Sequence, residues 1–164
     1  MSASCSSDTG TKSASAPQVQ QNTPASPAGA AAIQDAGSAT CPHTGKWALC
    51  SVENRLRQAG FVAKKTEGKP IRRPGFSVEP VVYKLGSGRL EVFIYADEAA
   101  MERDVAKIDT LTVAPAGVAS PWDGTPVLVR SGNLAAVLVT ENQSQIERLT
   151  LALTAGAPQP GSPR

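Results

Sequence analysis

The sequence predicts an α+β fold, a two-layer sandwich in which helices cover one face of a four-stranded antiparallel sheet. Two observations lead to this prediction. Two segments rich in β-branched residues are each divided by a glycine-containing turn and followed by apolar residues at helical spacing. A further amphipathic helix precedes both segments. The expected order of elements is therefore α-ββα-ββα.

The first helix is predicted over residues 46–59. Its apolar side chains Leu49, Val52 and Leu56 recur at helical spacing, with polar residues between them. Gly60 follows, and a glycine at this place is typical of a helix end. The helix is therefore amphipathic, with one face available for a core.

Residues 64–75 contain two prolines and two glycines, so we expect a loop rather than a regular element. The loop is basic. It carries five cations and one acidic residue, Glu67. The cations are Lys64, Lys65, Lys69, Arg72 and Arg73. Beside a membrane such a loop would be attracted to anionic head groups. The alternative is that these cations only keep the domain soluble.

The first hairpin is predicted from residues 78–85 and 89–95, joined by Gly86-Ser87-Gly88. Pro80 lacks an N–H group, so the first strand starts late or lies at the edge of the sheet. Asp97 then caps a second helix, which is expected to end near residue 108.

The second unit repeats this order. Residues 127–130 and 134–140 are predicted strands, and a last helix begins after Asn142 and ends at Gly156. Ser87-Gly88-Arg89-Leu90 and Ser131-Gly132-Asn133-Leu134 occupy matching places, which indicates two ββα units about forty-five residues apart.

We expect one globular domain over residues 44–156, preceded by a disordered spacer over 1–43 and followed by a short disordered tail over 157–164. The spacer is rich in Ser, Ala and Pro. Few of its side chains could be buried, so its ordering entropy would not be offset.

Cys5 follows Ser2-Ala3-Ser4, and small residues before a cysteine are typical of the signal that directs lipid attachment in bacterial lipoproteins. A secretory leader needs an apolar stretch of about 7–15 residues, whereas four residues precede Cys5. We therefore expect residues 1–4 to be the remnant of a leader and Cys5 to carry diacylglycerol and fatty acyl groups such as palmitate. The alternative is that Cys5 is an ordinary cysteine of a disordered segment.

The other two cysteines, Cys41 and Cys50, would then be free to form a disulfide, as is common in exported proteins. Free thiols are one alternative. A metal site with His43 is another, but a structural zinc needs four ligands and the chain has one histidine. We expect no metal and no cofactor.

The aromatic residues suggest a possible binding surface. Tyr83, Phe93 and Tyr95 are expected on one face of the sheet, where they could form a shallow platform for a partner. Trp122 could be an exposed anchor in the same role. The alternative is that the three sheet residues are core or sheet covering and that Trp122 folds back as a lid on the core.

The sequence lacks the patterns of common enzymes. His43 lies beside Pro42, no Gly-x-Ser-x-Gly pattern occurs, and Gly86-Ser87-Gly88 lacks the helix and lysine of a phosphate-binding loop. The formal charge of +2 is too small to indicate a nucleic-acid-binding protein. No apolar run approaches the roughly 18 residues of a membrane span.

The chain resembles a group of small bacterial envelope lipoproteins that have no assigned activity. The resemblance covers residues 46–154. It is carried by Ala59-Gly60-Phe61, Tyr83, Gly86, Leu90-Glu91-Val92-Phe93-Ile94-Tyr95-Ala96-Asp97 and Trp122. It implies a compact α+β domain and an address at the periplasmic or extracellular face of a membrane, with no catalytic residues to transfer.

We therefore expect a non-enzymatic, monomeric envelope protein, anchored through Cys5, whose domain binds a partner protein or another ligand. An alternative is an inhibitor of a lysozyme or protease that uses residues 121–125 or the basic loop as a wedge. A further alternative is an enzyme with an unfamiliar site.

Overall fold

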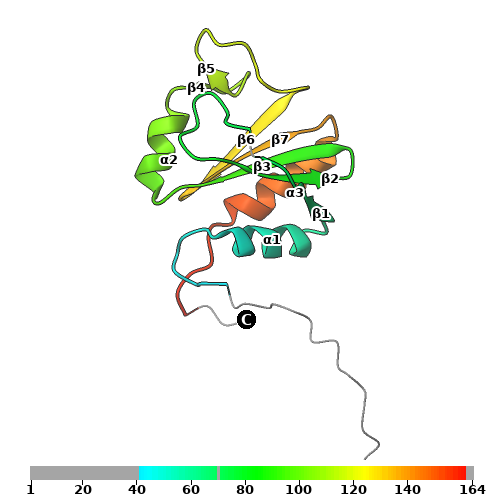
Figure 1. Ribbon diagram of the computed structural model, residues 1–164. Coiled ribbons are helices and arrows are strands. Elements are labelled where there is room, and N and C mark those ends of the chain that lie inside the picture. The colour runs from blue at the N-terminus through cyan, green and yellow to red at the C-terminus, as the bar shows by residue number, and fades with distance from the viewer. Residues whose placement is uncertain (1–40, 70, 162–164) are drawn as a thin grey trace, which may run out of the picture. The chain divides into compact units, whose positions relative to one another are not determined.

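The computed structural model describes residues 41–69 and 71–161 of the chain (Figure 1). The prediction for Cys5 and for the spacer up to residue 40 lies outside these residues. The elements, in chain order, are α1 (Leu49–Gln58), β1 (Ala63–Lys65), β2 (Val81–Leu85), β3 (Gly88–Ile94), α2 (Glu98–Val105), β4 (Ile108–Asp109), β5 (Ala114–Pro115), β6 (Pro126–Ser131), β7 (Leu134–Val139) and α3 (Gln143–Thr154).

The α+β class is confirmed. The main sheet has the strand order β1-β2-β3-β7-β6, and every neighbouring pair is antiparallel. It has five strands rather than the predicted four, because residues 63–65, the last two of which fall in the expected loop, pair with β2. β4 and β5 form a separate two-stranded sheet.

Helices lie on both faces of the sheet, so the predicted two-layer arrangement is wrong. Figure 1 shows α1 and α3 on one side and α2 with the β4–β5 hairpin on the other. Central strands β3 and β7 explain this arrangement, because each buries apolar side chains on both faces. Leu90 and Leu138 pack toward α1 and α3, whereas Phe93 and Val137 pack toward α2. The surface of the sheet that carries Phe93 and Val137 is called the α2 face below.

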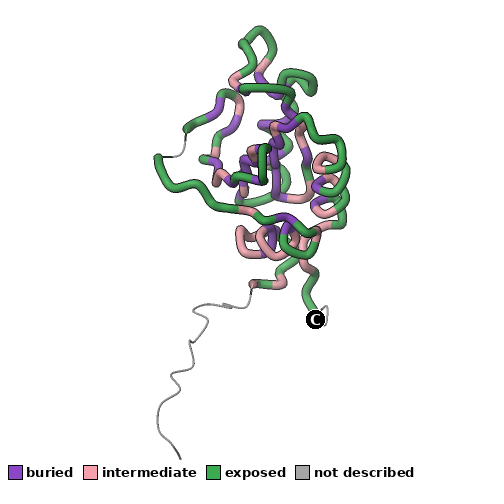
Figure 2. Tube along the Cα trace, turned by 90° about the vertical axis from the view of Figure 1, so that its right-hand side faces the viewer, coloured by how far each residue is buried: buried purple, intermediate pink, exposed green. Residues whose placement is uncertain are grey.

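Buried residues concentrate along the strands and on the inner sides of the helices (Figure 2). Two apolar clusters result, one on each face of the sheet. One lies between the sheet and α1 and α3, and the other lies between the α2 face, α2 and the chain around Trp122.

The predicted helix caps are confirmed. The side chain of Asp97 accepts a hydrogen bond from Ala100 N at 2.8 Å, and that of Asn142 accepts one from Gln145 N at 3.2 Å. Helix α2 ends earlier than predicted, at Val105, and residue 108 belongs to β4.

The two hairpins turn at different places in the repeated pattern. Gly86 (φ 62°) and Gly132 (φ 53°) each take the first of two turn positions, where the left-handed region favours glycine. Gly88 is already the first residue of β3. Ser87-Gly88 and Ser131-Gly132 look alike in the sequence, but relative to the turns of their hairpins they differ in position by two residues. Helices α2 and α3 also lie on opposite faces, so the two ββα units are not structural copies.

The start of the domain is held by covalent and polar contacts. Cys41 and Cys50 form a disulfide, as predicted. The Asn133 side chain accepts a hydrogen bond from Trp47 N at 2.7 Å, and its Nδ2 donates to the carbonyl oxygens of Trp47 and Tyr95. One buried amide therefore joins the segment before α1 to the β6–β7 turn and the end of β3.

Candidate functional site

A buried ion pair lies on the α2 face of the sheet. Glu91 of β3 is on the same side as Phe93 because side chains alternate along a strand. Arg73, from the loop before β2, donates from Nε to Glu91 Oε2 at 2.8 Å, and its Nη2 bonds the other carboxylate oxygen. Their side chains are 8% and 2% exposed, respectively. This pair fixes the loop on the sheet.

Trp122 covers the ion pair. The Arg73 guanidinium lies 4.6 Å from the centre of its ring, and Arg73 Nη1 donates to Pro121 O at 3.1 Å. Trp122 Nε1 donates to Val113 O at 2.9 Å. Val113 has φ 47°, which is strained for a β-branched residue, and this contact helps to hold it. Trp122 is therefore a lid on the core, one of the two interpretations of the sequence.

The charge of Arg73 is supported by this environment. Hydrogen bonding to Glu91 raises the pKa of the Arg73 guanidinium above its ordinary value, although burial acts in the opposite direction. Arg73 is therefore charged at any ordinary pH.

Arg89 is a second cation beside the same carboxylate. Its Nε lies 3.3 Å from Glu91 Oε1, and its Nη1 lies 3.6 Å from Asp123 Oδ2. Within the part of the chain that the structure describes, the buried atoms Nε and Nη2 of Arg89 have no hydrogen-bond partner. Such donors are uncommon in native proteins and often mark a place where water or an ion binds.

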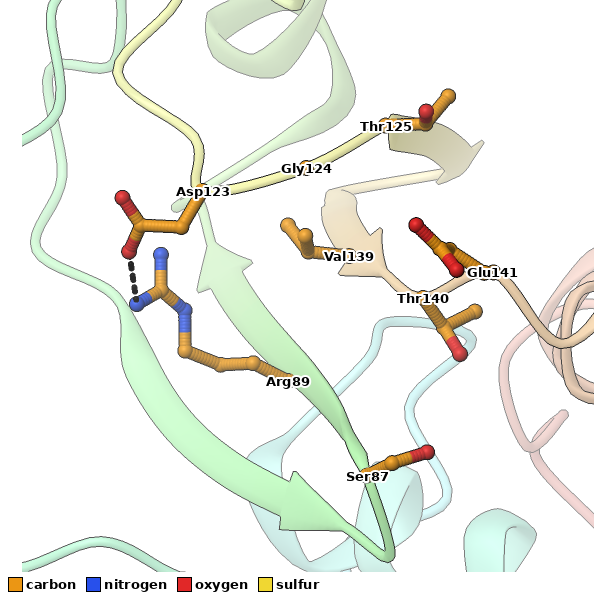
Figure 3. Close-up of a pocket in the computed structure, with 8 residues that line it drawn as sticks. All are labelled: Ser87, Arg89, Asp123, Gly124, Thr125, Val139, Thr140 and Glu141. Carbon is orange, nitrogen blue, oxygen red and sulfur yellow. Dashed lines mark ion pairs between the residues drawn. The ribbon is translucent and has the colours of Figure 1, made fainter.

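A polar cleft of about 430 Å³ opens beside Arg89 (Figure 3). It is called the Arg89 cleft below. It is formed by the β2–β3 turn, the segment after Trp122 and the end of β7. Its lining residues are Ser87, Arg89, Asp123, Gly124, Thr125, Val139, Thr140 and Glu141. Figure 3 shows the Arg89 side chain directed at the Asp123 carboxylate, with Ser87, Thr140 and Glu141 at the other end.

A second cleft, of about 350 Å³, lies under the basic loop and also includes Arg89. Lys65, Lys69 and Arg73 line it, so the structure brings together three of the five predicted cations. Arg72 is 81% exposed and pairs with Glu79. Lys64 is exposed on β1 and does not line this cleft.

The predicted aromatic platform is not formed. Tyr83, Phe93, Tyr95 and Trp122 are all at most 6% exposed. They also lie on different faces: Tyr83 pairs with Leu90 and packs toward α1 and α3, whereas the other three pack on the α2 face. Their burial agrees with the alternative that they belong to the core.

The two tyrosine hydroxyls are paired with carboxylates. Tyr83 Oη donates to Glu53 Oε1 at 2.7 Å, and Tyr95 Oη donates to Asp104 Oδ2 at 3.1 Å. Burial, reinforced by the adjacent carboxylates, raises the pKa of both tyrosines well above the ordinary range. These hydroxyls are therefore neutral structural groups.

Asp104 is held in its charged form. Desolvation alone would raise the pKa of Asp104, but hydrogen bonds from Ser77 and Tyr95 and the charge of Lys107 outweigh it, so the pKa lies below the ordinary value. Ser77 N donates to Asp104 Oδ2 at 2.6 Å. This carboxylate joins α2 to the loop before β2.

Polar and apolar groups both line the Arg89 cleft. Ser87 and Thr125 are exposed, and in the described residues their hydroxyls bond to no imidazole or carboxylate that would activate them. Thr140 Oγ1 bonds Gln145. The cleft offers a cation, free hydroxyls and the methyl groups of Val139.

Cys41 and Cys50 form a disulfide with each other and therefore offer no thiolates as metal ligands, so the alternative metal site with His43 is not formed. Across residues 41–69 and 71–161, no three metal-ligating side chains gather in one place. None of the helices in these same ranges has the length and apolarity to cross a membrane.

Sequence reasoning missed Arg89, Glu91 and Asp123. A signal was present for one of them: Glu91 interrupts an otherwise apolar run, Leu90-Glu91-Val92-Phe93-Ile94, and a buried carboxylate requires a cation. Which cation it pairs with depends on the path of a long loop.

Comparison of the chain with protein-family models, curated protein sequences and solved structures finds no match.

Proposed function

We propose that this chain is a non-enzymatic protein of the cell envelope, anchored to a membrane by lipid on Cys5, whose folded domain is a binding module. We place its binding site at the Arg89 cleft. The observation that supports the proposal is the state of Arg89, a partly buried cation that shares one carboxylate with Arg73 and has two buried donor atoms without a hydrogen-bond partner among the described residues.

Two features support the envelope address. The Cys41–Cys50 disulfide is typical of oxidising compartments. The sequence around Cys5 has the small residues that lipid attachment requires. With the disulfide formed, Cys5 is left as the one thiol in the chain that a lipid could modify.

Capture from envelope extracts tests the binding module. The immobilised protein is compared with Arg89→Ala and with the matched control Arg130→Ala, which removes an exposed arginine of β6 that forms no ion pair within the described residues. We expect a specific protein or small molecule to be captured by the unmodified protein and by the control, and to be lost with Arg89→Ala. Equal capture by all three would contradict the assignment of the site.

The anchor is tested separately by intact mass. The gene, with its upstream region, is expressed in its native host, and the mass is measured without reduction. We expect a chain that starts at Cys5, carries acyl groups and is two hydrogens lighter than the fully reduced chain. A chain with an unmodified Cys5 would rule out the lipid anchor and leave the binding proposal standing.

A second candidate function, an inhibitor, is favoured by the loop between β4 and β5. Leu111 is 82% exposed at this loop, and Asp109 Oδ1 accepts hydrogen bonds from Leu111 N at 2.8 Å and Thr112 N at 3.0 Å. A rigid loop that presents one apolar side chain suits insertion into another protein's cleft. Inhibition of a lysozyme or protease that is lost with Leu111→Asp and kept with Arg89→Ala would favour this candidate.

A further inference from the structure

We propose that the Arg89 cleft binds a carboxylate group of its ligand, and that the Asp123 carboxylate occupies the place of this group when the ligand is absent. This inference rests on the function proposed above and specifies the chemistry of the ligand. The Arg89 guanidinium would donate to the ligand carboxylate, and the Asp123 side chain would turn away from Arg89.

The charges around Arg89 require an anion. Arg73 takes both oxygens of Glu91, so the buried group of two arginines and one carboxylate has an excess of one positive charge. Asp123 is the nearest group that can balance this charge, at 3.6 Å. A partly buried cation without a close counter-charge is costly. Asp123 offsets this cost only in part, so an anion that binds closer to Arg89 would gain additional electrostatic attraction.

Asp123 is suited to be displaced. Its side chain is 92% exposed, and its 3.6 Å contact is longer than a charge-assisted hydrogen bond of about 2.7–2.9 Å. Gly124, the next residue, has φ 149°, a conformation that other residues rarely adopt, and a Cβ at this position would lie only 3.1 Å from Val139 Cγ1. Trp122 is fixed on the core by its hydrogen bond to Val113. Release of Asp123 therefore need not disturb the segment that carries it.

The rest of the cleft selects a monoanion with a polar body. Ser87 and Thr125 supply exposed hydroxyls within the cleft, and Val139 supplies a small apolar wall. Glu141 lines the same cleft and bears a negative charge. A phosphate dianion would exceed the single excess charge at Arg89 and would be repelled by Glu141, whereas one carboxylate balances it.

The test is a titration of the full-length protein, labelled with ¹⁵N, with N-acetylglycine and in parallel with inorganic phosphate. We expect N-acetylglycine to shift the Arg89 Nε–H resonance and the amides of Ser87 and Thr125, and phosphate to have a weaker effect. Stronger binding of phosphate than of N-acetylglycine would overturn the choice of carboxylate.

Two variants with the same charge change identify the competitor. Asp123→Asn should tighten N-acetylglycine binding about two- to fivefold, the range expected when an exposed ion pair is removed. Glu98→Gln, at an exposed residue of the first turn of α2, should leave it unchanged. Equal effects of the two variants would show that only net charge matters and would overturn the role of Asp123.

Arg89→Gln should abolish the titration while the remaining amide spectrum keeps the pattern of the folded protein. If Arg89→Gln does not show the spectrum of a folded protein, the same titration is made with Arg89→Lys. We expect this variant to bind N-acetylglycine measurably but more weakly than the unmodified protein. No binding of N-acetylglycine to either the unmodified protein or Asp123→Asn would overturn this inference. If envelope capture still depended on Arg89, the proposed binding function would survive that result.

Discussion

Breaking the buried ion pair of Arg73 should cost far more stability than breaking the exposed pair of its neighbour Arg72. The side chains of Arg73 and Glu91 are 8% and 2% exposed, whereas those of Arg72 and Glu79 are 81% and 52% exposed. Removing one partner of a buried pair typically costs about 3–5 kcal/mol. Because Arg89 lies 3.3 Å from Glu91 and offsets part of the loss of Arg73, we expect about 3 kcal/mol for Arg73→Met. Glu91→Gln leaves both arginines without their carboxylate, so we expect about 5 kcal/mol, the upper end of this range.

A double-mutant cycle by urea unfolding, with the disulfide intact, measures the pair itself. The double variant should be no less stable than the worse single variant, which gives a coupling of at least about 3 kcal/mol. The control cycle, Arg72→Ala with Glu79→Ala, should give a coupling below about 0.5 kcal/mol because both charges remain hydrated. The coupling energies of the two cycles could be equal while the dependence of the unfolding free energy on urea concentration is unchanged. That result would refute the claim that burial strengthens the Arg73–Glu91 pair.

Three further predictions concern stability. Asn133→Ala should cost about 3 kcal/mol, because three hydrogen bonds to buried backbone groups are lost; a loss of under 1 kcal/mol in thermal unfolding would contradict the role of this amide. Reduction of Cys41–Cys50 should cost about 2.5 kcal/mol from the loop entropy of a separation of 9 residues, and a Cys41→Ser, Cys50→Ser variant should be insensitive to reductant. Because folding lowers the pKa of Asp104, its carboxylate stabilises the folded protein at pH values above the pKa of Asp104 in the unfolded chain, and this contribution is lost as pH falls below about 4. An unfolding free energy that falls as steeply with decreasing pH in Asp104→Asn as in the unmodified protein would refute this contribution.

The sequence predicted the elements whose signals are local. The apolar spacing of α1, the caps Asp97 and Asn142 and the two glycine turns depend on neighbours within a few residues, and the structure confirms them. The late start of β2, at Val81, follows from Pro80 in the same way. The Cys41–Cys50 bond was also predictable, because those cysteines stand close together in the sequence at the start of the domain.

The layers and the site depend on contacts between distant segments. The apolar run Leu134-Ala135-Ala136-Val137-Leu138 fits burial on one face or on both, and the position of α2 decides between them. Tyr83 and Phe93 were expected on the same face, but the register of β2 with β3 places them on opposite faces. A shift of one residue in strand register reverses every side chain, so parity alone could not settle the binding surface.

The same buried carboxylate connects the fold to the proposed function. Buried ion pairs are weak evidence for stability, because apolar replacements of similar volume often stabilise proteins equally well. Glu91 does what an apolar residue could not: it holds the loop of Arg73 on the sheet and, through Arg73, the carbonyl of Pro121 and the ring of Trp122. These contacts place the walls of both clefts that include Arg89. Replacement of the Arg73–Glu91 pair by two methionines would then preserve the fold but leave Arg89 without the Glu91 carboxylate. This variant would show whether the domain can stay stable while its capacity to bind a carboxylate changes.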